Sequence, residues 1–391
     1  MVTLSLSDLR RFLENPAQAS ARVRLGLGDD REDETDDALS SLDDERFSFD
    51  EYRLDRAMLL RSAIEAFVEG AEALWRGAAA TLRPRVEEMR ALPKGSRKAA
   101  DKARKAAVEA ALNSATAAFE PDLRVWFERH LPIELDALRG AGKFPAGLFG
   151  KASTDRLIDL LTTWSRGFIQ LPLSEGESLR RVSFGEPRAG KRGRDFRPAI
   201  DLGEFALSNG EMVHVRLVGT TEIVGVQAGC LRRAISFVAR KTEEKIDCLR
   251  GLFTALACLA ARVTPEVAAD FDCVTIFGSG EHRNASLSGV SPSEALDYLR
   301  GLSRALIDGD HLYWLPGEAV LKAMSKGARN ALDKNLGGER QSRGPLRQSE
   351  IDALPWPGAP VVEEAFFSRS DGSPPRWRFI LEHLSGVEFS E

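Results

Sequence analysis

The chain has 391 residues, of which 43% are hydrophobic and 29% are charged, which suffices for a buried core and predicts two or three packed units. It contains no run of roughly 20 apolar residues that could span a membrane and no basic-then-apolar export signal at its start, so we expect a cytoplasmic protein with no membrane partner. The net charge of −5 hides an uneven distribution, because residues 29–45 carry ten acids and one arginine, which leaves +4 on the other 374 residues.

The opening of the chain predicts two short helices. Ser5 or Ser7 can cap the first, and Asp8 lies in its first turn, where negative charge suits the helix dipole. The pair Asn15-Pro16 ends this helix and starts the second, because proline is tolerated at a first helical position.

An acidic loop is predicted over residues 28–46. Its ten acids and three apolar residues cannot offset the entropy of an ordered chain, so we interpret it as solvated and mobile. The alternative is a phosphate mimic that occupies a basic groove when DNA is absent.

Most of the chain up to residue 170 is predicted to be helical. Apolar residues at three- and four-residue intervals predict a helical run from Tyr52 to about Leu92, which Pro84 is expected to divide. Further helices are predicted over residues 121–140 and from Thr154 to Phe168, with a glycine- and proline-rich loop over 141–152 between them.

Basic residues gather in two segments. Residues 94–106 predict either a solvated helix face, which we favour, or a helix along a phosphate backbone. Residues 185–198 predict a flexible basic loop, because their arginines and lysine, Arg197 among them, lie among glycines and prolines. Since lysine and arginine hold a DNA backbone without reading sequence, the candidate DNA contacts are the most densely placed cations: Arg188, Lys191, Arg192, Arg194, Lys98, Lys102 and Lys105.

The pattern changes to strands after residue 200. Residues 212–217 alternate as in a half-buried strand, Ser208-Asn209-Gly210 is a hairpin signal, and 271–278 predict another strand. Helices are expected from Thr242 to about Val263 and from a capping box at 291–294. The remaining predicted elements are a short strand at 311–316, a helix at 318–332 and an irregular tail with several prolines over 341–391.

These elements predict an α+β fold (mixed α/β), in which a helical N-terminal part packs on a mixed sheet flanked by helices. The expected division is a helical part over 1–170, an α/β core over 171–340 and the tail over 341–391. Four cysteines without C-x-x-C spacing and five scattered histidines argue against a zinc site, so reduced, buried thiols and no metal cofactor are expected.

The order of helices, β-meander, helix and further strand suits a restriction-endonuclease-like (PD-(D/E)XK) core. Active members place one acid in G-x-x-D and the next in acid-x-Lys, so that two carboxylates hold a divalent cation. Here Gly219-Thr220-Thr221-Glu222 sits where the first motif belongs, and Ala239-Arg240-Lys241 occupies the place of the second, with alanine in place of the acid. Glu222 and Lys241 are therefore vestigial candidates, and no catalytic residue is assigned.

Several separated motifs resemble the C-terminal region of the exodeoxyribonuclease V gamma chain (RecC family). They are LSLSDLRRFLENPAQASARVRLGL followed by acids, LRGAGKFPAGLFG, VRLVGTTEIVGVQAGCLRR and SPSEALDYLRGLSRALIDGDHLYWLP. They agree in order and cover residues 3 to about 335. The two helicase-like domains that precede this region in the family are absent, which suggests a fragment, and so is a Walker motif for ATP hydrolysis.

The resemblance implies a subunit of a DNA end-processing helicase–nuclease. In that heterotrimer RecB-like and RecD-like motor subunits supply ATPase and nuclease activity, and this domain guides DNA and scaffolds its partners. Two alternatives remain: an autonomous metal-dependent nuclease with a site built from Glu222 and Lys241, and a protein-interaction module whose basic loops contact acidic surfaces.

Overall fold

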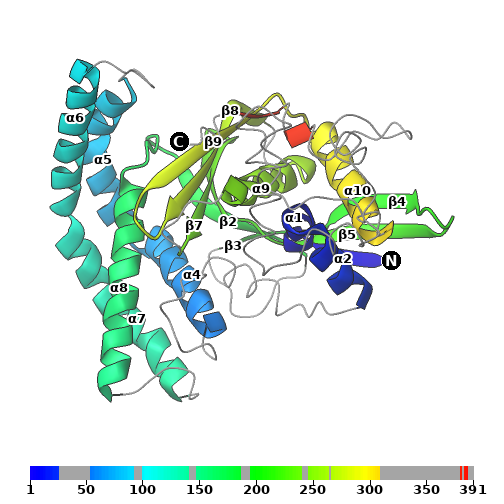
Figure 1. Cartoon of the computed structure of the whole chain (residues 1–391), viewed down its shortest axis with the longest axis horizontal. Helices are drawn as coiled ribbons and strands as arrows, with labels where there is room; N and C mark the ends of the chain where they lie inside the picture. Colours follow the sequence, from blue (N-terminus) through cyan, green and yellow to red (C-terminus); the bar gives the residue numbers. More distant parts are fainter. Residues whose placement is uncertain are drawn as a thin grey trace, which may run out of the picture.

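The computed structural model describes residues 1–25, 53–91, 99–140, 147–185, 194–239, 245–263, 266–308, 379–380 and 383–385. In these ranges the chain forms an α+β fold, with helices on both faces of a curled mixed sheet (Figure 1). This confirms the fold class predicted from the sequence. None of the described helices is long and apolar enough to cross a membrane.

Most described helices precede the main strands in the sequence. They are α1 (Leu6–Glu14), α2 (Pro16–Leu25), α4 (Arg53–Gly70), α5 (Glu72–Arg90), α6 (Ala99–Ala117), α7 (Glu120–Gly140) and α8 (Gly147–Ile169). Two more, α9 (Cys248–Ala260) and α10 (Pro292–Asp308), lie among the strands, and the 3-10 turn η2 (Lys245–Asp247) leads into α9.

The sheet order is β1-β5-β2-β6-β7-β8-β9-β10, with β3 beside β2 and β4 beside β5. The strands are β1 (Val2–Ser5), β2 (Ser178–Phe184), β3 (Arg194–Arg197), β4 (Ile200–Ala206), β5 (Met212–Thr220), β6 (Ile223–Gln227), β7 (Cys230–Val238), β8 (Glu266–Phe277), β9 (His282–Ser288) and β10 (Leu384–Ser385). β6 and β7 form an antiparallel hairpin, whereas β7 and β8 are parallel and α9 makes the crossover that a parallel pair requires.

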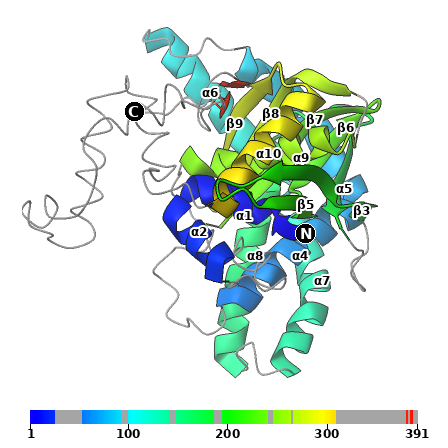
Figure 2. The ribbon, with the colours of Figure 1, turned by 90° about the vertical axis from the view of Figure 1, so that its right-hand side faces the viewer.

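Two clusters of buried hydrophobic residues lie on opposite faces of the sheet, because successive strand residues point to opposite faces. Val224 and Ala234 join α1, α2, α9 and α10 in one cluster, which we call the α9 layer. Ile223 and Ile235 join helices from the α4–α8 segment in the other, which we call the helical layer. Figure 1 shows the two layers on either side of the sheet, and Figure 2 looks onto the molecule from the side of the α9 layer. The predicted boundary at residue 170 divides the sequence by composition, whereas the clusters place residues 4–19 with the α9 layer.

Two sets of contacts, a helix cap and a strand pairing, fix the start of the chain. Ser5 is the N-cap of α1: its side chain accepts from the Asp8 backbone N–H at 3.0 Å, and the Asp8 carboxylate accepts from the Ser5 N–H at 2.8 Å. The predicted cap is therefore confirmed as a reciprocal capping box. Strand β1 was not predicted from the sequence; it pairs in parallel with β5 and gives the first residues a place in the sheet.

Two predictions about helix boundaries are wrong. The run from Tyr52 to Leu92 breaks at Ala71, between α4 and α5, while Pro84 lies inside α5. The carbonyl that loses its donor at Pro84 is that of Ala80, which is exposed, so water can solvate it. The predicted loop over 141–152 is also too long, because α8 already begins at Gly147.

The strand region contains more strands than the sequence predicted. The hairpin at Ser208-Asn209-Gly210 is confirmed, with the Leu207 N–H donating to the Glu211 carbonyl at 2.8 Å. Strands β2 and β9 were missed. The flexible loop predicted over 185–198 is wrong at its end, because residues 194–197 form β3 in parallel with β2.

The capping box of α10 is confirmed: Ser291 N–H donates to Glu294 Oε2 at 2.8 Å and Glu294 N–H to Ser291 Oγ at 3.2 Å. The described fragments of the predicted tail join the core, since Phe379 stacks on Tyr298 with ring centroids 4.2 Å apart and Leu384–Ser385 pair with β9. The acidic loop 28–46 and the elements predicted at 311–316 and 318–332 lie outside the described residues.

Candidate functional site

Glu222 lies at a bend where β5 continues into β6. Both strands run alongside β2: Ser183 lies opposite Thr220, and Arg180 lies opposite Val224. Three steps along β2 thus correspond to four steps along the facing chain, so one extra residue is accommodated at Thr221-Glu222. An irregularity of this kind bends a strand and re-aims its side chains.

Hydrogen bonds hold this bend in place. The Val182 N–H donates to Thr221 Oγ1 at 3.0 Å, and the Thr221 N–H donates to the Val182 carbonyl at 2.9 Å. On the other side, the Glu222 N–H donates to Thr254 Oγ1 of α9 at 3.0 Å. The backbone of Glu222 is therefore fixed between the sheet and the α9 layer.

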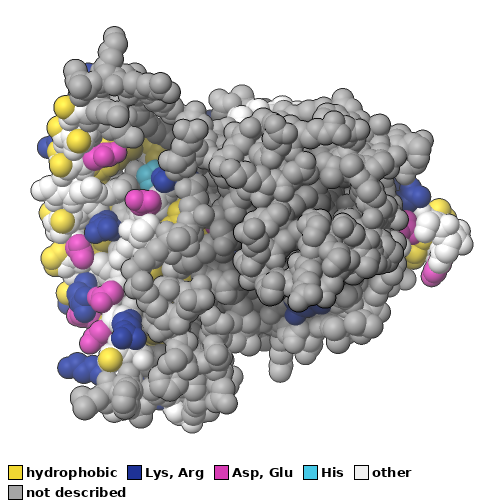
Figure 3. Space-filling model, in the orientation of Figure 1, with side chains coloured by type: hydrophobic (Ala, Val, Ile, Leu, Met, Phe, Trp, Pro, Cys, Tyr) yellow, Lys and Arg dark blue, Asp and Glu magenta, His cyan; other side chains and the backbone are white. Residues whose placement is uncertain are grey.

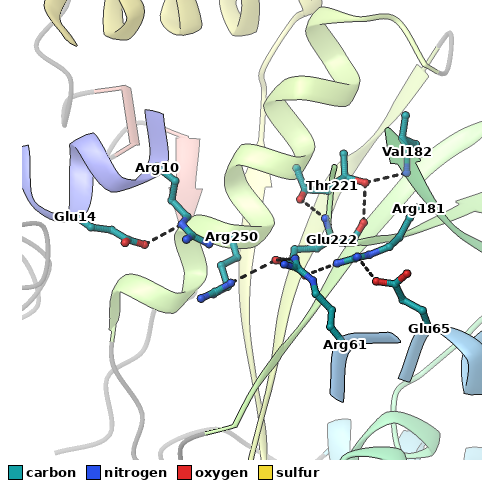
Figure 4. A network of polar contacts seen from close by, with 10 residues as sticks. Arg10, Glu14, Arg61, Glu65, Arg181, Val182, Thr221, Glu222 and Arg250 are labelled. Atoms are coloured by element: carbon teal, nitrogen blue, oxygen red, sulfur yellow. Dashed lines mark hydrogen bonds and ion pairs between the residues drawn. The ribbon is translucent and has the colours of Figure 1, made fainter. Parts of the chain in front are cut away.

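The carboxylate of Glu222 meets three arginines (Figure 4). Its Oε1 lies 3.1 Å from Arg61 Nη2 and 3.6 Å from Arg250 Nη1, and its Oε2 lies 3.5 Å from Arg181 Nη2. Arg181 also pairs with Glu65 of α4. We call these five side chains the Glu222 cluster.

The Glu222 cluster connects both layers to the sheet. Arg61 and Glu65 come from α4 of the helical layer, Arg250 comes from α9, and Arg181 stands on β2. The Glu222 side chain is only 10% exposed, and those of Arg181 and Arg250 are 5% and 6% exposed. Charges at this depth are stable only when they are paired, so the cluster fixes the two layers against each other.

The arrangement directs the carboxylate toward guanidinium groups. A hard cation such as Mg²⁺ requires carboxylate oxygens in its own coordination shell, but both oxygens of Glu222 face arginine nitrogens. Within the described residues, no group of three or more histidine, cysteine, aspartate or glutamate side chains is placed to hold a metal ion.

The second motif position lies at the same end of the β6–β7 hairpin. Ile223, next to Glu222, lies opposite Ile235, and β7 ends at Val238 just before Ala239. Ala239 packs against the hydrophobic cluster of the helical layer, where a carboxylate would have to be desolvated. Lys241, the other vestigial candidate, lies outside the described residues.

The candidate DNA contacts are only partly placed. Lys98, Arg188, Lys191 and Arg192 lie outside the described residues. The backbones of Lys102 and Lys105 belong to α6, and that of Arg194 starts β3. On the face in Figure 3, the described side chains of the helical layer, at the left, mix both charges with apolar groups and form no patch of one sign.

Two of the four free cysteines are fully buried, as predicted, and the other two, Cys230 and Cys248, are half-buried. Burial raises the pKa of the Cys258 thiol to about 12 and that of Cys273 well above its usual value. The thiolate is the reactive form of cysteine, and a raised pKa disfavours it. Both thiols therefore serve as small apolar side chains in the packing.

Sequence reasoning identified Glu222 but missed its arginines. Arg61, Arg181 and Arg250 come from three elements far apart in the sequence, and no spacing links them. No family model matches the chain, and no curated protein matches it.

Proposed function

We propose that this chain is a nuclease-like domain that holds DNA without cutting it. In this proposal it guides DNA ends and scaffolds RecB-like and RecD-like motor subunits in a cytoplasmic exodeoxyribonuclease V-type helicase–nuclease that serves double-strand break repair. The observation that carries the non-catalytic part is the position of Glu222, whose two carboxylate oxygens face three arginines.

Electrostatics supports this interpretation of Glu222. A divalent cation at the carboxylate would lie within a few ångströms of guanidinium groups that the fold holds in place, and like charges repel strongly where water is scarce. The missing second acid adds to this, because the methyl group of Ala239 supplies no ligand. The resemblance of several sequence motifs to the RecC family supports the DNA-guiding and scaffolding part.

Cleavage assays test the non-catalytic part. Purified protein is incubated with linear duplex and single-stranded DNA in Mg²⁺ or Mn²⁺, and no degradation is expected. Cleavage that Glu222→Gln abolishes would show an autonomous metal-dependent nuclease instead. Glu281→Gln is the matched control, because Glu281 is an exposed glutamate between β8 and β9.

Binding assays test the guiding part. Forked DNA is titrated into the protein at two salt concentrations, and a dissociation constant of about 10⁻⁴ to 10⁻⁶ M at physiological salt, without sequence preference, is expected. Binding should strengthen at low salt. If the motor subunits bind this chain but DNA does not, the chain is a protein-interaction module.

A further inference from the structure

A second arginine cluster lies where β3 pairs with β2, at the edge of the sheet and on the face that carries the α9 layer. Asp195 Oδ2 lies 3.3 Å from Arg180 Nη1 and 3.0 Å from Arg197 Nη2. The parallel register places Val182 opposite Asp195 and Phe184 opposite Arg197, so Arg180, two residues before Val182, shares their face of the sheet. We call Arg180, Asp195 and Arg197 the Asp195 cluster.

The two guanidinium groups of this cluster have donors left over. Each arginine offers five N–H donors, and one carboxylate oxygen accepts from Arg197 and forms an ion pair with Arg180. Among the described residues, Nε of Arg180 and Nε of Arg197 have no hydrogen-bond acceptor. The side chains of Arg180 and Arg197 are 36% and 41% exposed and that of Asp195 is 19% exposed, so the cluster is partly open to solvent although both Nε atoms are buried.

The cluster carries a net charge of +1, and replacing its internal ion pairs loses little free energy. With arginines more than a third exposed and Asp195 19% exposed, these pairs are partly screened by water, and surface arginine–carboxylate pairs typically contribute about 1 kcal/mol or less. A phosphodiester group offers two non-bridging oxygens, whereas both arginines share a single oxygen of Asp195, and arginine binds phosphate in a bidentate manner.

We propose that Arg180 and Arg197 form a binding site for a phosphodiester group of a nucleic acid backbone, with Asp195 holding the two guanidinium groups in place until the phosphate binds. The choice of a nucleic acid rests on the proposed function, whereas the site itself rests on the cluster. Neither Arg180 nor Asp195 is among the cations or acids that the sequence singles out.

The test compares variants of the whole chain. Arg180→Gln with Arg197→Gln removes the site, and Arg216→Gln with Arg232→Gln is the matched control, because these are exposed arginines on strands β5 and β7 of the same sheet. The probes are inorganic phosphate and a short oligothymidylate, measured by calorimetry and fluorescence anisotropy. Circular dichroism verifies that each variant is folded.

The site variant should bind the oligothymidylate about tenfold or more weakly than wild type at low salt, and its salt slope should fall by about 1.4, the value for two lost contacts to a single strand. The control should change much less. Asp195→Asn should strengthen binding of both probes, and more than Glu281→Gln does, because it removes the negative charge inside the site.

The outcomes separate the site from the proposed function. If wild type binds the oligothymidylate and both double variants bind it equally well, the site is wrong while the proposed function stands. If phosphate binding depends on Arg180 and Arg197 but no nucleic acid binds, the anion site stands, whereas its nucleic acid ligand and the proposed function fall. If wild type binds neither probe, both proposals are overturned.

Discussion

The Glu222 cluster and the Asp195 cluster are built from the same groups but differ in burial. Each joins arginines through one carboxylate, and β2 contributes neighbouring residues to both, Arg181 to the first and Arg180 to the second. Because Arg180 and Arg181 point to opposite faces of the strand, one guanidinium is buried under α4 while the other reaches solvent.

Burial changes what such a cluster can do. In the buried cluster the carboxylate cannot leave its arginines, because the guanidinium groups would lose their shared anion in a medium that solvates them poorly. In the Asp195 cluster, which is partly open to solvent, water and salt weaken the ion pairs, so a ligand can replace the carboxylate. The first arrangement therefore stabilises the fold, and the second suits reversible binding.

The largest expected effect compares the two carboxylates directly. Glu222→Gln should lower the free energy of unfolding by about 3 to 5 kcal/mol, because it leaves buried arginines without their shared anion. Asp195→Asn should lower it by less than about 1 kcal/mol. Urea denaturation of both variants measures the difference. Equal losses would mean that burial does not distinguish the two clusters.

A buried ion pair with a single arginine tests whether burial alone is enough. If it is, moving the carboxylate should lower the free energy of unfolding. Glu177 Oε1 lies 2.8 Å from Arg233 Nε, with side chains 0% and 7% exposed. A methyl group at Gly225 would lie 2.1 Å from that oxygen. We expect Gly225→Ala to destabilise the fold by about 2 to 3 kcal/mol.

Gly301→Ala is the control for that change. Gly301 is an exposed residue of α10 with no atom within 4 Å of the added methyl group, and alanine should stabilise the helix by roughly 0.5 to 1 kcal/mol. Thermal unfolding of both variants measures the two effects. A Gly225→Ala protein as stable as wild type would show that the Glu177–Arg233 pair moves without cost.

The smallest expected effect concerns Glu294, an exposed carboxylate. Hydrogen bonds from the Ser291 hydroxyl and backbone N–H hold its pKa below the ordinary value of 4.5. A lowered folded-state pKa means that its contribution is present above pH 4.5 and disappears as the pH falls through the folded-state value. Glu294→Gln should therefore narrow the difference in stability between pH 7 and pH 3. Urea denaturation at both pH values measures this difference in the free energy of unfolding. The same difference in the variant and in wild type would contradict the prediction.

Several elements were predictable from the sequence because local interactions decide them. The capping boxes at Ser5 and Ser291 need only residues three positions apart, and the hairpin at Ser208-Asn209-Gly210 needs a single turn. The break at Ala71 was not predictable in this way, since proline is the stronger local signal and the solvent exposure of Ala80 made Pro84 tolerable.

The sequence by itself determined the fold class, the capped starts of α1 and α10 and Glu222 as a candidate, because periodicity, caps and motif spacing act over a few residues. Only the tertiary structure decided that Glu222 faces arginines, since α4, β2 and α9 bring Arg61, Arg181 and Arg250 together across almost 200 positions of the chain. It also decided that neighbouring arginines of β2 belong to different clusters. The alternation of side chains is local, but which face of a strand is buried depends on the layers that pack against it.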